Sequence, residues 1–228
     1  MSNTPYYETE LGKLYHGDCL EIMPMLEPVD LVLTDPPYNI PTQAAQTRKI
    51  TRTIGDLSMI EASFRLLFDL TLNLVGNDGR HFVFADAISY PVIFRAIYGK
   101  AKTALLVWDK GRIGMGREFR KQFELIMHTW GDDTPVVSSE GVGFSDILKR
   151  KPVTNKDKLH PAQKPINLIK DLLRVSGKIV LDPFLGSGTT AVACERLNRR
   201  WIGIEIEEKY CEIAAKRIEK ERSQLKLF

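Results

Sequence analysis

The feature that most constrains the fold is residues 178–205, in which a short apolar run, a glycine-containing turn, a helical segment and a second apolar run follow one another. We predict strands at 178–181 and 199–204, with a helix at 191–197 between them. A strand, a helix and a strand in this order are typical of a parallel, doubly wound sheet. The chain is therefore expected to have an α/β fold.

The rest of the chain alternates in the same way. Ser58, followed three residues later by Glu61, has the capping-box pattern, so a long amphipathic helix is predicted to begin at Ser58. A basic, glycine-rich stretch follows Trp108 and leads into an extended segment at 122–130, which predicts an antiparallel hairpin at one edge of the sheet. The other predicted strands are 13–16, 29–33, 81–84 and 103–108, and the predicted helices are 19–26, 58–75, 90–98, 167–175 and 207–224.

Two acids follow predicted strands in the amino-terminal half. Asp18 comes after the strand at 13–16, and Asp35 comes after the strand at 29–33. Ligands of open α/β sheets bind outside the carboxyl ends of the strands, so we expect both acids to face one crevice from neighbouring strands. An aspartate before a helix also often caps that helix, and Asp18 can have both roles.

Asp35 opens the sequence Asp35-Pro36-Pro37-Tyr38. Two consecutive prolines fix φ and provide no backbone donors, so the chain after Asp35 is predicted to form a stiff turn. The turn would hold a carboxylate, backbone carbonyls and an aromatic ring together at the end of a strand. A turn that merely ends the strand is the structural alternative.

The turn Gly186-Ser187-Gly188 lies between a predicted strand and a predicted helix. Glycine lets the backbone approach a ligand closely, and Glu205 at the end of the next strand is placed to accept hydrogen bonds from ribose hydroxyls. The turn lacks the full GxGxxG spacing, and no lysine follows it, which disfavours a nicotinamide dehydrogenase and a phosphate-binding loop. A nucleoside ligand without phosphates, S-adenosylmethionine, fits better.

The composition sets broad limits on the function. A chain of 228 residues, 43% hydrophobic and 27% charged, fits one globular domain, and a net charge of +3 neither requires nor excludes nucleic acid. Cys19, Cys194 and Cys211 are odd in number and form no CxxC pair, so we predict neither disulfides nor a metal site. Without an apolar run of membrane-spanning length or a signal peptide, a soluble cytoplasmic protein is expected.

Three polar or basic segments are candidates for contact with nucleic acid. Residues 39–56 form a long polar stretch that is interpreted either as a substrate flap or as a solvated loop. Residues 131–158 have no clear periodicity and are interpreted either as a short target-recognition insertion or as an ordinary surface insertion. Together with the predicted hairpin loop, these segments give as candidate contacts Arg48, Lys49, Arg52, Lys110, Arg112, Arg117, Lys149, Arg150 and Lys151.

Several motifs together resemble one family. Asp35-Pro36-Pro37-Tyr38 resembles the catalytic motif of the amino-group DNA methyltransferases, which methylate an exocyclic nitrogen of adenine or cytosine. DPFLGSGTT at 182–190 resembles their cofactor loop, HPAQKP at 160–165 the segment over the methionine end of the cofactor, and GDCL at 17–20 their adenine-binding position. WDKG at 108–111, followed by Gly114, Gly116 and Glu124, resembles their hairpin region. The match covers about 13–217, and the order of motifs is that of the permuted β group.

The resemblance implies an α/β, Rossmann-like, S-adenosylmethionine-dependent methyltransferase fold in a single domain, 1–228, with a mostly parallel doubly wound sheet and one antiparallel edge hairpin. It implies a reaction without a metal ion. The implied catalytic residues are Asp35, Pro36, Pro37 and Tyr38. The implied cofactor contacts are Asp18, Cys19, Asp35, His160, Lys164, Asp182, Phe184, Gly186, Ser187, Gly188, Thr189, Thr190, Glu205 and Ile206.

By the same resemblance, Asp18 faces the cofactor adenine, Glu205 the ribose, and His160 and Lys164 the methionine carboxylate. The expected substrate is N6 of adenine in a short sequence of double-stranded DNA, because the motif begins with Asp35, where enzymes that methylate the cytosine amino group more often have serine. N4 of cytosine, adenine in RNA, and a non-enzymatic nucleic-acid-binding protein with the same fold stay open. A homodimer and a cognate restriction endonuclease also stay open as partners.

Overall fold

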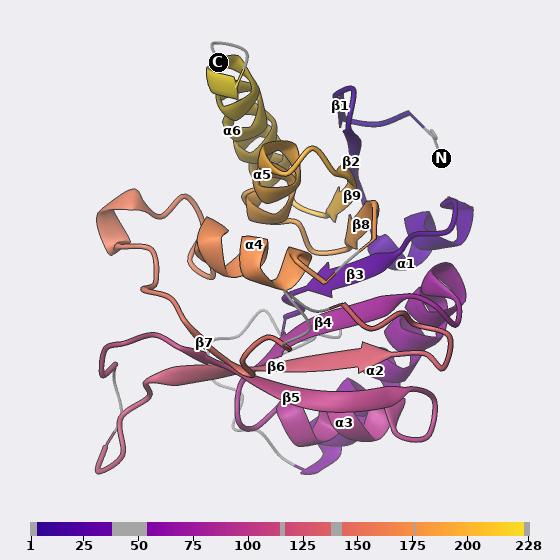
Figure 1. The fold of residues 1–228 in the computed structure, drawn as a ribbon, viewed down its shortest axis with the longest axis vertical. Helices are drawn as coiled ribbons and strands as arrows, with labels where there is room; N and C mark the ends of the chain where they lie inside the picture. Colours follow the sequence, from indigo (N-terminus) through magenta and orange to yellow (C-terminus); the bar gives the residue numbers. More distant parts are fainter. Residues whose placement is uncertain (1–3, 38–53, 115–116, 138–142, 176, 226–228) are drawn as a thin grey trace.

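The computed structural model describes residues 4–37, 54–114, 117–137, 143–175 and 177–225 (Figure 1). Within these ranges the strands form one sheet in the order β1-β2-β9-β8-β3-β4-β6-β5-β7. The strands are β1 (Tyr7–Glu8), β2 (Gly12–His16), β3 (Leu31–Thr34), β4 (Arg80–Ala85), β5 (Lys102–Asp109), β6 (Phe123–Trp130), β7 (Ile147–Lys149), β8 (Ile179–Asp182) and β9 (Arg200–Glu205). The helices are α1 (Cys19–Ile22), α2 (Ile54–Val75), α3 (Tyr90–Ile97), α4 (Ile166–Leu173), α5 (Thr189–Arg196) and α6 (Glu208–Leu225), with short 3₁₀ turns at Met23–Met25 and Asn155–Asp157.

The predicted sheet is confirmed. Strands β2, β9, β8, β3 and β4 are parallel, and β6 runs antiparallel to both β4 and β5, which makes β5 and β6 the predicted hairpin. The hairpin is not the outermost pair, because β7 adds to β5 in parallel, and β1 adds an antiparallel strand at the opposite edge. With two and three residues, β1 and β7 are too short to show a sequence period.

The sheet carries a hydrophobic core on each face. Successive side chains of a strand point to opposite faces. In β3, Leu31 and Leu33 pack in the cluster that contains α4, α5 and α6, and Val32 packs in the cluster that contains α2 and α3. Figure 1 shows these two groups of helices on different sides of the strands. Each fully buried leucine contributes about 1.5–3 kcal/mol relative to an exposed one, so this layered core holds the strand ends in fixed positions.

Two local predictions are wrong. Helix α2 begins at Ile54, so Ser58 lies inside the helix and is not its cap. Asp18 and Asp35 do not follow neighbouring strands, because β9 and β8 lie between β2 and β3. Both errors have the same cause: spacing along the chain does not determine which of several local helix starts is used or which strands pair.

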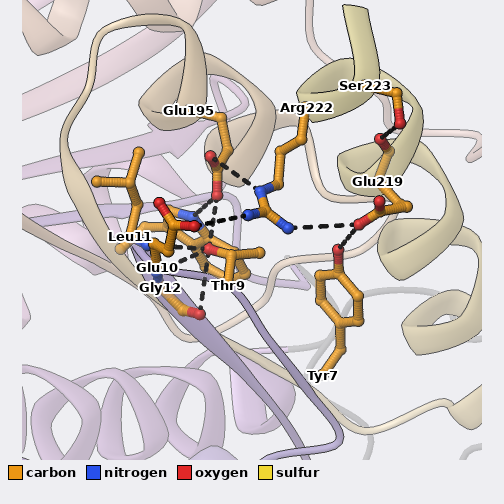
Figure 2. Close-up of polar contacts among 10 residues, drawn as sticks. Tyr7, Thr9, Glu10, Leu11, Gly12, Glu195, Glu219, Arg222 and Ser223 are labelled. Atoms are coloured by element: carbon orange, nitrogen blue, oxygen red, sulfur yellow. Dashed lines mark hydrogen bonds and ion pairs between the residues drawn. The ribbon is translucent and has the colours of Figure 1, made fainter. Parts of the chain in front are cut away.

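The two chain ends are tied together by polar contacts around Glu195 of α5 (Figure 2). Glu195 Oε1 accepts hydrogen bonds from Thr9 Oγ1 at 2.7 Å and from Trp201 Nε1 at 2.9 Å, and Arg222 Nε of α6 lies 3.8 Å from Oε2. Three segments, the β1–β2 turn, β9 and α6, therefore meet at one buried carboxylate. In the described ranges, no helix combines the length and the apolar character needed to cross a membrane.

Candidate active site

The carboxyl edge of the parallel strands carries a row of acids. Glu205 and Asp182 are the last residues of β9 and β8, and Asp35 follows β3 directly. Parallel strands end at the same edge of a sheet, and this is where ligands bind in open α/β folds. The strand order places the three acids in the sequence Glu205, Asp182, Asp35 along that edge.

A pocket with about 470 Å³ of empty volume lies at this edge. It brings together Asp35, the HPAQKP segment and the glycine turn, which are far apart in the chain. Leu33, Phe84 and Ile169 supply apolar surface beneath these groups. The predicted site residues that line it are Asp35, His160, Lys164, Asp182, Phe184, Gly186, Ser187, Thr189 and Thr190.

The glycine turn has the backbone that only glycine adopts without strain. Gly186 has φ +54° and Gly188 has φ +80°, and Gly188 caps the start of α5. Glu205 Oε2 accepts the Gly186 amide at 2.8 Å, and Oε1 accepts the Glu207 amide at 2.8 Å. The carboxylate of Glu205 therefore fixes the turn from the neighbouring strand, a role that the sequence did not reveal.

Asp182 fixes the other end of the same turn. Its carboxyl accepts Thr190 Oγ1 at 2.6 Å and the Phe184 amide at 3.1 Å. Burial raises the pKa of Asp182 to about 7, and its hydrogen bonds with Thr190 and Phe184 only partly oppose this shift. Asp182 thus stabilises the turn from beneath the pocket.

Arg217 of α6 closes over the turn from outside. Its Nη1 donates to the Ser187 carbonyl and to Thr189 Oγ1, both at 3.0 Å. Arg217 is not among the site residues predicted from the sequence. The helical spacing does place Arg217 beside the apolar face of α6, because it precedes the buried Ile218 and follows the buried Ala214 by three residues. A cation at such a position is a candidate for contact with the segment against which the helix packs.

Lys164 lies between two carboxylates. Its Nζ donates to Asp35 Oδ2 at 2.6 Å and lies 3.1 Å from Glu124 Oε2 of β6. Burial opposes the ammonium, but the carboxylates of Asp35 and Glu124 outweigh burial and raise the pKa of Lys164. Glu124 is the second residue that the sequence analysis did not assign to the site, although a carboxylate among the apolar residues of a predicted strand is an unusual position.

His160 lines the same pocket. Its ring meets the Tyr210 ring edge to face, with the ring centres 4.4 Å apart, and its Nδ1 accepts the Ala162 amide at 3.1 Å. Burial lowers the pKa of His160, although nearby carboxylates, Glu205 first, oppose this shift. Gly186 lies against the same ring, since a Cβ there would be 3.8 Å from it.

Asp18 and Cys19 lie beside this pocket rather than in its wall. Asp18 caps α1, accepting the Leu20 amide at 2.9 Å, so the capping alternative is confirmed. It also lines a second hollow of about 1290 Å³ together with Tyr6, Tyr15 and His16. The Gly17 amide, which lines this second hollow, donates to the Glu205 carbonyl at 3.0 Å. Cys19, Cys194 and Cys211 are free and buried, and Ile206 is exposed.

The hairpin loop and the segment at 149–151 lie side by side. Lys149 of β7 lies opposite Asp109 of β5 in the strand register, and the Arg150 amide donates a hydrogen bond to the Asp109 carbonyl at 3.1 Å. Arg112, Arg117, Lys149 and Lys151 are exposed at this edge. The other two cations form ion pairs: Lys110 with Glu124 at 2.6 Å, and Arg150 with Asp171 at 2.8 Å.

Some predicted residues lie outside the described ranges. These are Tyr38 of the proline corner and Arg48, Lys49 and Arg52 of the predicted flap. The flap was predicted at 39–56, and its last three residues belong to α2. In the described part of the chain, no group of three or more histidine, cysteine or acidic side chains could hold a metal ion.

Comparison with known proteins identifies the family. The chain is 26% identical to the Type II methyltransferase M2.DpnII of Streptococcus pneumoniae over 97% of this chain and 94% of the relative. Its fold matches that of the M1.HpyAVI–SAM complex with a TM-score of 0.71 and 23% identity, over 91% of this chain and 99% of the other. It also matches the cytosine-N4-specific PvuII DNA methyltransferase with a TM-score of 0.76 and 18% identity, over 96% of this chain and 94% of the other. The family model of the N6/N4 DNA methylases matches residues 29–216. The chain therefore belongs to the DNA methylase family, whose cofactor is S-adenosyl-L-methionine.

Proposed function

We propose that the chain transfers a methyl group from S-adenosyl-L-methionine to the exocyclic N6 of adenine in a short sequence of double-stranded DNA. One observation carries the proposal. Asp35 at the end of β3 lines the same pocket as the glycine turn after β8, so a methyl donor and a target amino group can meet there. A catalytic carboxylate must lie within reach of the group that reacts.

The residues of the pocket fit this cofactor. Gly186 and Gly188 have positive φ, and glycine at Gly186 leaves the pocket open against His160, so the backbone can approach a ligand closely. The ligand carries no phosphate to be neutralised. The carboxyl oxygens of Asp35 and Asp182 are polar neighbours for a sulfonium, although Lys164 already pairs with Asp35 and burial favours the neutral form of Asp182. Glu205 and Asp18 would face the nucleoside, and Phe184, Ser187, Thr189 and Thr190 the methionine part. When bound, the cofactor supplies the methyl group on a sulfur that is a good leaving group.

Asp35 would act on the target amino group. The lone pair of an amino group conjugated to a purine is delocalised, so the nitrogen is a poor nucleophile. Hydrogen bonds from its hydrogens to the Asp35 carboxylate and the Pro36 carbonyl would favour a pyramidal nitrogen with its lone pair directed at the methyl group. Pro37 would keep this corner rigid.

The target base has to leave the duplex to reach the pocket. Tyr38 would stack on the extruded base, and such contacts contribute roughly 1–3 kcal/mol. The exposed cations Arg112, Arg117, Lys149 and Lys151 would contact the phosphate backbone from the edge that holds Asp35. This surface would also include Arg48, Lys49 and Arg52 of the flap, together with Lys110 and Arg150. Residues 131–158 would recognise the target sequence.

N4 of cytosine is the second candidate, because a solved structure of similar fold is a cytosine-N4-specific methyltransferase. Adenine is favoured because the motif begins with Asp35. The same proposal includes membership of the permuted β group and a homodimer. It also includes a cognate restriction endonuclease as partner, because the curated relatives are Type II methyltransferases.

Labelled methyl transfer tests the proposal. The chain is incubated with S-adenosyl-L-methionine labelled in its methyl group, together with an unmethylated DNA duplex library and RNA of the same sequences, and the products are digested to nucleosides for mass spectrometry. We expect label in N6-methyldeoxyadenosine. Label in N4-methyldeoxycytidine would favour the second candidate, and label in RNA nucleosides alone would contradict the DNA substrate.

A further inference from the structure

The antiparallel strand β6 brings a charged side chain to the active site. Strands β3 and β4 end at the ligand-binding edge, whereas β6 runs the other way and begins there. Its second residue, Glu124, pairs with Trp108 of β5 and lies one position beyond the Ala85–Leu125 pair that ends β4. The hairpin therefore contributes a carboxylate to the edge at which Asp35 lies.

Lys164 links this carboxylate to Asp35. Its ammonium has three N–H donors, and it lies 2.6 Å from Asp35 Oδ2 and 3.1 Å from Glu124 Oε2. The ring of Phe84 lies beneath it, with the ring centre 4.8 Å from Nζ. The ammonium therefore contacts two carboxylates and an aromatic ring, and the Lys164 side chain is only 10% exposed.

Lys110 completes the chain of charges on the far side of Glu124. Its Nζ donates to Glu124 Oε1 at 2.6 Å and lies 5.1 Å from the centre of the Trp108 ring. The four charges alternate in sign along Lys110, Glu124, Lys164 and Asp35, so they sum to zero. Burial alone would raise the pKa of Glu124, but the two lysines outweigh burial and lower it. Exposed ion pairs contribute little, but partly buried pairs in a connected network are held more firmly.

We propose that Glu124 and Lys164 are positioning residues for Asp35: Glu124 holds the Lys164 ammonium in place, and Lys164 fixes the orientation of the Asp35 carboxylate toward the target amino group. The terminal torsion of an aspartate is broad, so an ammonium bound to Oδ2 restricts which orientation the carboxylate adopts. The inference rests on the proposed role of Asp35. It differs from the expectation that Lys164 binds the methionine carboxylate of the cofactor.

Single and double substitutions separate these two roles. The variants are Lys164→Met, Glu124→Gln and the double variant, and the control is Lys102→Met, which removes an exposed ion pair with Asp132 at 3.0 Å. For each, single-turnover methyl transfer to DNA gives the rate, calorimetry without DNA gives the Kd of S-adenosyl-L-methionine, and thermal unfolding confirms the fold.

We expect Lys164→Met to lower the single-turnover rate by about 100-fold, the effect of a reacting group misplaced by about 1 Å, with an unchanged cofactor Kd. Glu124→Gln should lower the rate less, and the double variant should be no slower than Lys164→Met alone, because both changes act on one carboxylate. A cofactor Kd that rises in proportion to the rate loss, additive effects in the double variant, or a wild-type rate in Lys164→Met would each overturn the inference.

A readout without DNA keeps the inference separate from the proposed function. Nitrogen NMR of the Lys164 ammonium follows its titration in the wild type, Asp35→Asn and Glu124→Gln. We expect both substitutions to lower the pH at which Lys164 titrates, because each removes a negative neighbour. A change in only one variant would overturn the inference. Wild-type protein that methylates no nucleic acid would refute the proposed function, whereas the NMR titration would still decide whether one ammonium joins both carboxylates.

Discussion

A buried carboxylate, Glu195, and a half-buried one, Asp35, each meet partners from distant parts of the chain, but with different surroundings. Glu195 accepts hydrogen bonds from Thr9 and Trp201 and faces Arg222, so the β1–β2 turn, β9 and α6 close around it (Figure 2). Asp35 meets Lys164 at 2.6 Å, but both side chains also line the open pocket at the carboxyl edge of the sheet.

The difference separates a cluster that stabilises the fold from one that lies at the proposed catalytic site. A buried charge needs partners in either case, because an uncompensated charge is costly away from water. Around Glu195 the partners are donors that the fold itself brings together, so the cluster stabilises the fold. Asp35 meets a lysine that also contacts a second carboxylate, and this cluster lines the pocket at the carboxyl edge of the sheet.

Removal of the Glu195 carboxylate should have the largest effect on stability. Glu195→Ala leaves the buried Trp201 N–H and the Thr9 hydroxyl without this acceptor, and we expect a loss of about 3 kcal/mol in the free energy of unfolding, measured in urea. Methyl transfer below the unfolding temperature should stay near that of the wild type. The control Glu219→Ala removes exposed contacts and should cost less than about 1 kcal/mol. A loss of transfer without a loss of stability would contradict the comparison.

A methyl group at the glycine turn should affect both stability and cofactor binding. Gly188 has φ +80°, and a Cβ there would lie 3.0 Å from Ala214 Cβ. We expect Gly188→Ala to cost about 1–2 kcal/mol of stability and to weaken cofactor binding measured by calorimetry. Gly99→Ala is a matched control, because Gly99 has φ +78° with no atom within 4 Å of its added Cβ. It should lose stability but keep cofactor affinity, and equal affinities of the two variants would count against the turn as the binding element.

A third expected effect on stability is a pH dependence from Asp182. Burial raises its pKa in the folded chain to about 7 from an ordinary value of 3.8. The neutral form therefore favours the folded state: the contribution is complete below the unfolded pKa and is lost as the pH rises through the folded pKa. Urea unfolding of Asp182→Asn between pH 4.5 and 7.5 should show a weaker decline in stability than the wild type. An identical decline in both proteins would show that Asp182 is not its source.

The sequence predicts much of this fold because local signals agree with it. The order of strands and helices, the hairpin, the glycine turn and the acids Asp35, Asp182 and Glu205 all follow from runs of residues and their spacing. These features depend on short segments whose hydrophobic period or turn residues carry the information.

What the sequence does not provide depends on contacts between distant segments. Insertion of β6 between β4 and β5 brings Glu124 to the site, and Lys164 reaches Asp35 from 129 residues away. Arg217 reaches the glycine turn only because α6 packs against it. The start of α2 was misplaced because Ser58 and Glu61 match a capping box that the longer helix does not use.

The most direct test of the account separates the two ends of the pocket, with Asp35 as the catalytic carboxylate and the glycine turn as the cofactor site. Asp35→Ala and the wild type are compared in cofactor binding by calorimetry and in transfer of labelled methyl to DNA. We expect Asp35→Ala to bind S-adenosyl-L-methionine nearly as well as the wild type and to lose on the order of 10²-fold or more in transfer. Transfer at the wild-type rate, or loss of cofactor binding together with transfer, would contradict this division of roles.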